Sequence, residues 1–135
     1  MGVVVFDSDV LIGFLSAADA HHEAAIPWLR DALEPGRRRL LCAVNYAEIL
    51  VGPLRVGRDR RVRDALARLG IEVVPVDAPL AEEAARLRAT AGLGLPDAFA
   101  VATALGARTL QRPDVRLATF DRAVAAAHAA LSSLP

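Results

Sequence analysis

Four carboxylate side chains, far apart in the sequence, each lie beside an apolar segment. They are Asp7, Glu48, Asp97 and Asp121. At such a position a side chain leaves the core and enters a crevice. Two like charges about 6 Å apart repel by roughly 3 kcal/mol at an effective dielectric constant near 20, so a cluster of four takes up protons or binds a hard cation such as Mg²⁺. The pattern therefore favours metal-assisted phosphate chemistry.

The segments that position these residues alternate between strand and helix patterns. Residues 2–6 form a continuous β-branched run, which is typical of a strand buried on both faces of a parallel sheet. We predict further strands at 40–43, 71–76 and 115–119. We predict helices at 9–17, 19–33, 58–69, 79–91, 97–106 and 122–131, and one that runs from the second strand to Gly52-Pro53. Pro27 should kink or break the helix at 19–33.

Alternating strands and helices predict an α/β fold: a three-layer α/β/α domain with a short, mostly parallel central sheet covered by helices on both faces. Ligands bind such sheets at the carboxyl ends of the strands. Asp7 and Asp121 directly follow predicted strands, and Glu48 and Asp97 lie close enough along the chain to reach the same edge.

Length and composition predict one globular domain over residues 1–135. Of these residues, 54% are hydrophobic and 24% are charged, as in an ordinary globular protein. The formal net charge is zero, so any polyanion must be bound locally. We expect no membrane span and no secretory signal, and a single cysteine, Cys42, fits a reducing compartment. The sequence therefore predicts a soluble cytoplasmic protein.

The four acidic residues lie in motifs that follow one another in a recognisable order. The motifs read VFDSDVLI at 5–12, AEIL at 47–50, LPDAFAVATA at 95–104 and TFDR at 119–122. Together they resemble PIN-domain ribonucleases, most closely the VapC-type toxins of bacterial toxin–antitoxin pairs. The resemblance covers nearly the whole chain, and its specificity comes from the four motifs in sequence, since each alone is weak.

This resemblance implies Mg²⁺- or Mn²⁺-dependent hydrolysis of RNA phosphodiesters. Asp7 and Asp97 would be direct ligands, whereas Glu48 and Asp121 would hold waters of the ion, complete a second ion site or orient the attacking water. Three further residues are candidates for hydrogen bonds to these groups: Ser8, Asn45 and Thr119. The resemblance further implies a homodimer and a cognate antitoxin that blocks the acidic pocket.

Three features depart from the family pattern. Asn45 stands where a Ser or Thr is common, although it can still hydrogen-bond a water or a carboxylate. Asp9 stands where the family more often has Asn, and it either adds negative charge beside the ligands or caps the first helix. The link before the fourth motif is long, so Asp114 is an alternative to Asp121. We interpret His21 and His22 as the surface start of a helix, because adjacent helical residues point in different directions.

Two other functions remain as alternatives. Residues 6–9 also resemble the motif of haloacid-dehalogenase phosphatases, although the chain is short and contains no lysine, the basic residue that such enzymes typically use. A catalytically inactive PIN-like binding module is the non-enzymatic alternative. The presence of all four acidic residues argues against it.

Overall fold

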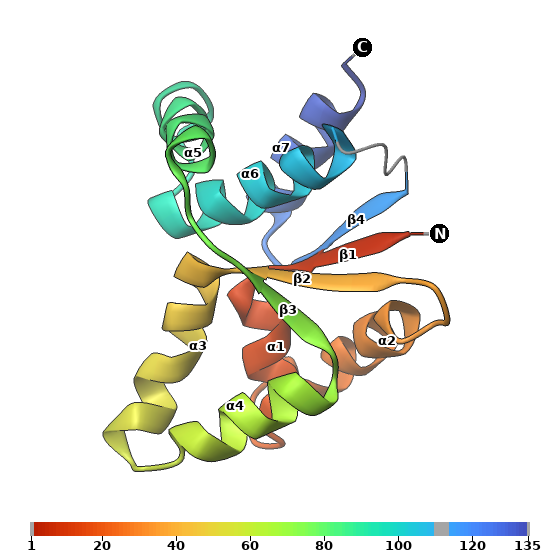
Figure 1. The fold of residues 1–135 in the computed structure, drawn as a ribbon, viewed down its shortest axis with the longest axis vertical. Coiled ribbons are helices and arrows are strands. Elements are labelled where there is room, and N and C mark those ends of the chain that lie inside the picture. Colours follow the sequence, from red (N-terminus) through yellow and green to blue (C-terminus); the bar gives the residue numbers. More distant parts are fainter. Residues whose placement is uncertain (1, 110–113, 135) are drawn as a thin grey trace.

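Four parallel strands form the centre of the molecule. The structure is a computed structural model that describes residues 2–109 and 114–134. The strands are β1 (Val3–Phe6), β2 (Arg38–Cys42), β3 (Ile71–Val74) and β4 (Val115–Ala118), and they lie in the order β3-β2-β1-β4 (Figure 1). Val5 pairs with Leu40 on one side and with Leu117 on the other. The predicted parallel sheet is confirmed.

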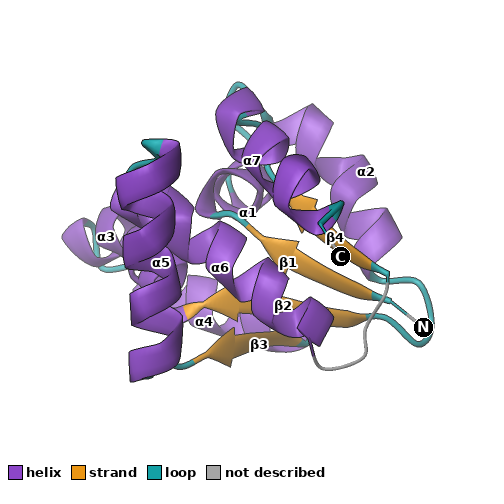
Figure 2. Ribbon diagram, turned by 90° about the horizontal axis from the view of Figure 1, so that it is seen from above, coloured by secondary structure: helices purple, strands orange, loops and turns teal. Residues whose placement is uncertain are grey.

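Helices cover both faces of this sheet. They are α1 (Ser8–Leu15), α2 (His22–Ala32), α3 (Ala43–Arg55), α4 (Asp59–Arg68), α5 (Ala78–Ala91), α6 (Leu95–Thr109) and α7 (Arg122–Ser132). The first four lie on one face and the last three on the other (Figures 1 and 2). The three-layer α/β/α fold that the sequence predicts is therefore confirmed.

Strand β1 explains why two cores form. Successive strand residues point to opposite faces, so Val3 and Val5 pack against α5, α6 and α7, while Val4 and Phe6 pack against the helices of the other layer. All four side chains are buried. A strand buried on both faces has a strongly specified register, and this fixes the residue that follows it.

Several predicted helix boundaries were wrong. Helix α2 begins at His22, because the Asp19 carboxylate accepts a hydrogen bond from the backbone nitrogen of His21 in a preceding turn, and the helix then continues through Pro27. Helix α3 also continues past Pro53 to Arg55. A helical proline removes only its own backbone donor and disturbs the carbonyl four residues earlier, and both helices accommodate that loss.

Helix α6 begins two residues earlier than predicted, at Leu95. Pro96 then occupies the first turn, where a missing backbone N–H costs nothing. Asp97 lies in the same turn. Within the described residues, no helix is both long enough and apolar enough to cross a membrane.

Candidate active site

The carboxyl edge of the sheet brings the four sequence motifs together. Asp7 follows β1 directly, and Thr119 follows β4. Helix α3 leaves the end of β2 and carries Asn45 and Glu48, whereas the first turn of α6 carries Asp97. Because β1 is central and flanked by β2 and β4, Asp7 lies in the middle of the group.

Asp7 is the most buried carboxylate of this group, with only 2% of its surface exposed. Its Oδ1 accepts a hydrogen bond from the backbone nitrogen of Ser8 at 2.8 Å, which caps α1. Its Oδ2 accepts one from the Thr119 hydroxyl at 2.9 Å. Burial raises the pKa of Asp7 to about 7; the negative charges of Asp9 and Asp97 add to this effect and the two hydrogen bonds oppose it. The folded site therefore resists ionisation of Asp7.

The fourth motif is attached to Asp7 through Thr119. The Thr119 hydroxyl donates to Asp7 and accepts from the backbone nitrogen of Asp121 at 3.1 Å. The Asp121 carboxylate caps α7, because its Oδ1 accepts from the backbone nitrogens of Ala123 and Val124 at 2.8 and 3.2 Å. Asp121 is exposed at the end of this connection, where a substrate can reach it.

Asn45 connects the second and third motifs. Its side chain is fully buried, and Nδ2 donates to Glu48 Oε1 and to the backbone oxygen of Pro96, both at 3.1 Å. The Asn45 amide therefore holds the start of α6, which carries Asp97, close to the Glu48 carboxylate. Burial raises the pKa of Asp97, and the negative charges of Asp121, Glu48 and Asp9 raise it further.

Asp9 is a fifth carboxylate of the site, and the sequence indicated only that it adds charge or caps a helix. Its Oδ2 accepts from the backbone nitrogen of Phe120 at 2.9 Å, while its Oδ1 is buried without a hydrogen-bond partner among the described residues. Burial raises the pKa of Asp9, and the Asp121 charge adds to it. The spacing of two residues from Asp7 does not reveal this role, because residues two apart at a helix start do not share a face.

His21 and Phe120 lie beside Asp9, which the sequence did not indicate. Their rings stack with centroids 4.8 Å apart and planes inclined by 21°. His21 is close enough to Asp9 to lower the pKa of that carboxyl, against the dominant effect of burial. His21 is the exposed N-cap residue of α2, which confirms its interpretation as the surface start of a helix. Its position next to the acidic group is the feature that the sequence did not indicate.

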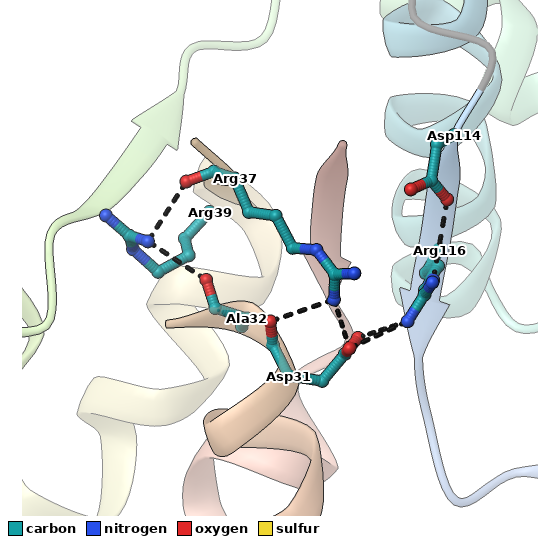
Figure 3. Close-up of polar contacts among 6 residues, drawn as sticks. All are labelled: Asp31, Ala32, Arg37, Arg39, Asp114 and Arg116. Carbon is teal, nitrogen blue, oxygen red and sulfur yellow. Dashed lines mark hydrogen bonds and ion pairs between the residues drawn. The ribbon is translucent and has the colours of Figure 1, made fainter. Parts of the chain in front are cut away.

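Asp114 lies at the opposite edge of the sheet. Its backbone oxygen accepts from the nitrogen of Val3 at the start of β1, and its carboxylate lies 3.4 Å from Nε of Arg116. Arg116 also binds Asp31, which in turn binds Arg37 (Figure 3). The alternative in which Asp114 replaces Asp121 is therefore not supported by the geometry.

The side chains at this edge are of the types that bind a hard divalent cation, although those that the structure describes are not placed around an ion site. Within residues 2–109 and 114–134, no group of three or more His, Cys, Asp or Glu side chains is placed to hold an ion. Mg²⁺ is usually held by only one or two carboxylates together with waters. The carboxylates of Asp7 and Asp97, whose pKa values are raised, and the buried Oδ1 atoms of Asp9 and Asn45, which have no hydrogen-bond partner in the part of the chain that the structure describes, are oxygen ligands of the kind that such an ion prefers.

Comparison with known proteins gives concordant results. No curated protein sequence matches the chain significantly. A toxin–antitoxin complex from Klebsiella pneumoniae is similar in structure, with a TM-score of 0.64 and 25% identity over 90% of this chain and 87% of that one. VapBC2 from Rickettsia felis, solved with a DNA fragment from its promoter, has a TM-score of 0.57 and 11% identity over 88% of this chain and 99% of that one. Residues 4–130 match the sequence profile of the PIN domain, and the chain therefore belongs to the PIN-domain family.

Proposed function

We propose that this protein is a metal-dependent endoribonuclease that acts as the toxin of a toxin–antitoxin pair. The observation that carries the proposal is the buried Asp7, whose pKa is raised to about 7 at the centre of the acidic group. Membership of the PIN family and the likeness to a Klebsiella pneumoniae toxin–antitoxin complex support it. A raised carboxyl pKa in a cluster of like charges is typical of a functional site.

The proposed reaction is hydrolysis of an RNA phosphodiester, in which a water oxygen forms a bond to phosphorus and the bond to the leaving oxygen breaks. A bound Mg²⁺ or Mn²⁺ would offset the negative charge and lower the pKa of the attacking water. Asp7 and Asp97 are the proposed ligands. Glu48 and Asp121 are the proposed outer carboxylates, which orient water or complete a second ion site.

The surrounding hydrogen bonds help to position three of these carboxylates, those of Asp7, Glu48 and Asp121. Ser8 and Thr119 hold the two oxygens of Asp7, and Asn45 holds Glu48. Groups that orient ligands in this way typically change activity or metal affinity by about 10–100-fold when they are removed. We therefore assign the side chains of Asn45 and Thr119 as positioning groups, and Ser8 positions Asp7 through its backbone nitrogen.

The phosphatase alternative is less well supported. Enzymes of that kind typically use a downstream lysine, and this chain contains none. The match to the PIN domain also covers the motif that suggested this alternative. The nuclease proposal is therefore the better supported of the two.

Substitution of Asp97 tests the nuclease proposal. We expect wild-type protein with Mg²⁺ or Mn²⁺ to cleave RNA, Asp97→Asn to abolish cleavage, and a chelator to do the same. Asp114→Asn is the matched control, because it removes an exposed carboxylate from the opposite edge of the sheet. Induced expression followed by mapping of new RNA 5′ ends gives the cleavage sites. Equal cleavage by the Asp97→Asn and wild-type proteins would refute the assignment of this residue, and absence of cleavage by wild-type protein would favour the inactive binding module.

A groove between α1, α3 and α4 is the proposed contact for the antitoxin. The groove has a volume of about 370 Å³, and its lining includes Ile12 and Val56, which are 37% and 68% exposed, together with Arg58 and Arg61. Apolar walls with a basic rim fit a segment that combines apolar and acidic side chains. The likeness to a toxin–antitoxin complex supports this occupant.

The antitoxin proposal is tested by searching the neighbouring reading frames for a small DNA-binding protein and co-expressing such a candidate with this chain. We expect Val56→Asp to prevent co-purification, and Val73→Asp, which changes an exposed valine of β3, to leave it intact. Retention of the complex by Val56→Asp protein would remove the groove from the interface. The predicted homodimer is tested in the same preparations by light scattering.

A further inference from the structure

The stacked rings of His21 and Phe120 lie at the edge of the acidic group. Phe120 is placed between Thr119, which binds Asp7, and Asp121. The Phe120 backbone nitrogen is held by Asp9 Oδ2 at 2.9 Å. Any phosphate bound between Asp7 and Asp121 would therefore have these rings as its neighbour.

Contacts within the protein hold both residues in place. The His21 backbone nitrogen donates to Asp19 Oδ1 at 2.8 Å, which sets the turn before α2. Phe120 packs against the core on the α1–α4 face of the sheet. The pair is thus formed before any substrate arrives, and rigid groups lose little entropy on binding.

The pair is also accessible. The side chain of His21 is 58% exposed, so the part of the imidazole that does not face Phe120 is open to solvent. Sequence-specific recognition of RNA mainly uses unstacked bases of single strands, which stack on aromatic and histidine rings. Every base has a π-face, and each stacked base contributes to affinity.

We propose that His21 and Phe120 form a subsite that stacks a base of single-stranded RNA next to the cleaved phosphate. This subsite rests on the proposed nuclease function and adds a determinant of substrate choice to it. His21 supplies the outer surface of the platform. Phe120 stacks on the other face of the imidazole, and because it lies between Thr119 and Asp121 it places the ring pair beside the acidic group.

The test measures RNA binding separately from cleavage. Asp97→Asn protein is titrated against a fluorescent single-stranded RNA of mixed sequence, and binding is followed by anisotropy, with and without the additional change His21→Ala. We expect binding to weaken about tenfold, within the range that a stacked base contributes, and His21→Phe to restore it. The same RNA with abasic sites around the cleavage position should bind the proteins with and without His21→Ala equally well.

His22 offers a matched control one residue away. Its Nδ1 lies 2.9 Å from the backbone oxygen of Gly13, and its ring stacks with Phe14, away from Phe120. We expect His22→Ala to leave RNA affinity unchanged even where it lowers the melting temperature. If both histidine variants lose RNA affinity in proportion to their drop in melting temperature, the role of His21 is structural and the proposal is overturned.

The remaining outcomes separate the two proposals. If wild-type protein cleaves RNA and His21→Ala leaves RNA affinity unchanged, the stacking subsite is wrong and the nuclease function stands. If the abasic RNA shows the same loss as the intact RNA, the subsite is also wrong. If wild-type protein neither binds nor cleaves single-stranded RNA, both proposals fail.

Discussion

Replacing Asp7 by asparagine should stabilise the metal-free protein, and the gain should depend on pH. The amide has the shape of the carboxylate and can keep both contacts, with Oδ1 accepting from Ser8 and Nδ2 donating to the Thr119 hydroxyl. The change therefore removes the charge and little else. The folded site disfavours the negative charge of Asp7, so its removal should raise the free energy of unfolding.

The magnitude follows from the pKa of Asp7, which is 3.8 ordinarily and about 7 in the folded protein. Between these values the folded carboxyl keeps a proton that the unfolded chain releases, so stability falls as the pH rises through this window. At about 1.4 kcal/mol for each pH unit, the full loss is roughly 4 kcal/mol above pH 7. Below pH 3.8 both states are protonated, and the loss disappears.

Carboxylates in ion pairs outside the site, such as Asp31, change stability in the opposite direction and must be separated from Asp7. Ion pairs with Arg37 and Arg116 lower the pKa of Asp31 against the effect of burial, so the stability that Asp31 contributes is present at neutral pH and lost as the pH falls. Subtracting the wild-type free energy of unfolding from that of Asp7→Asn at each pH cancels this background.

Urea denaturation of both proteins in a chelator, from pH 4 to pH 8.5, measures the difference directly. We expect a stability gain for Asp7→Asn that is near zero at pH 4 and rises toward about 4 kcal/mol at pH 8. A difference that stays flat across this range would refute the argument that Asp7 is protonated by burial. Added Mg²⁺ should reduce the difference, because wild-type protein alone keeps the ligand charge.

Four shorter predictions concern other parts of the site and core. Thr119→Val should lower RNA cleavage about 10–100-fold in single-turnover assays. Leu41→Ala, in a fully buried position, should cost about 2–5 kcal/mol in urea denaturation. Mg²⁺ at about 100 times its dissociation constant should stabilise wild-type protein by about 2.7 kcal/mol, a gain that Asp97→Asn should largely lose in thermal melts. Asp9→Asn should lower the pKa of Asp7 in an NMR titration, because the Asp9 charge raises it.

The main acidic residues could be placed from the sequence because each one follows or begins a secondary-structure element. In a parallel sheet, the residues after two strands necessarily share an edge, which places Asp7 and Thr119 together. Asn45 was predictable as a hydrogen-bond donor to a carboxylate, and it binds Glu48. These inferences need only local pattern and strand direction.

Contacts between distant loops could not be predicted in this way. Asp9 has the pattern of a helix cap, and its role emerges only because Phe120, 111 positions away, brings a backbone nitrogen to it. His21 likewise depends on Phe120 for its position. The second bond of Asn45, to Pro96, again joins two elements whose spacing is set by packing. Loop conformation and helix packing decide these contacts, and neither has a periodic signal.

The packing of β1 explains how the fold tolerates a buried carboxylate at its centre. Phe6 pairs with Ala118 in the register of β1 and β4, which places Asp7 beside Thr119 immediately afterwards. A shift of one residue would move Val3 and Val5 to the opposite core, so the apolar side chains of β1 hold the register against the cost of burying Asp7. The same cores therefore set the position of the site without contacting a substrate. A divalent cation bound at Asp7 would relieve this cost and link metal binding directly to stability.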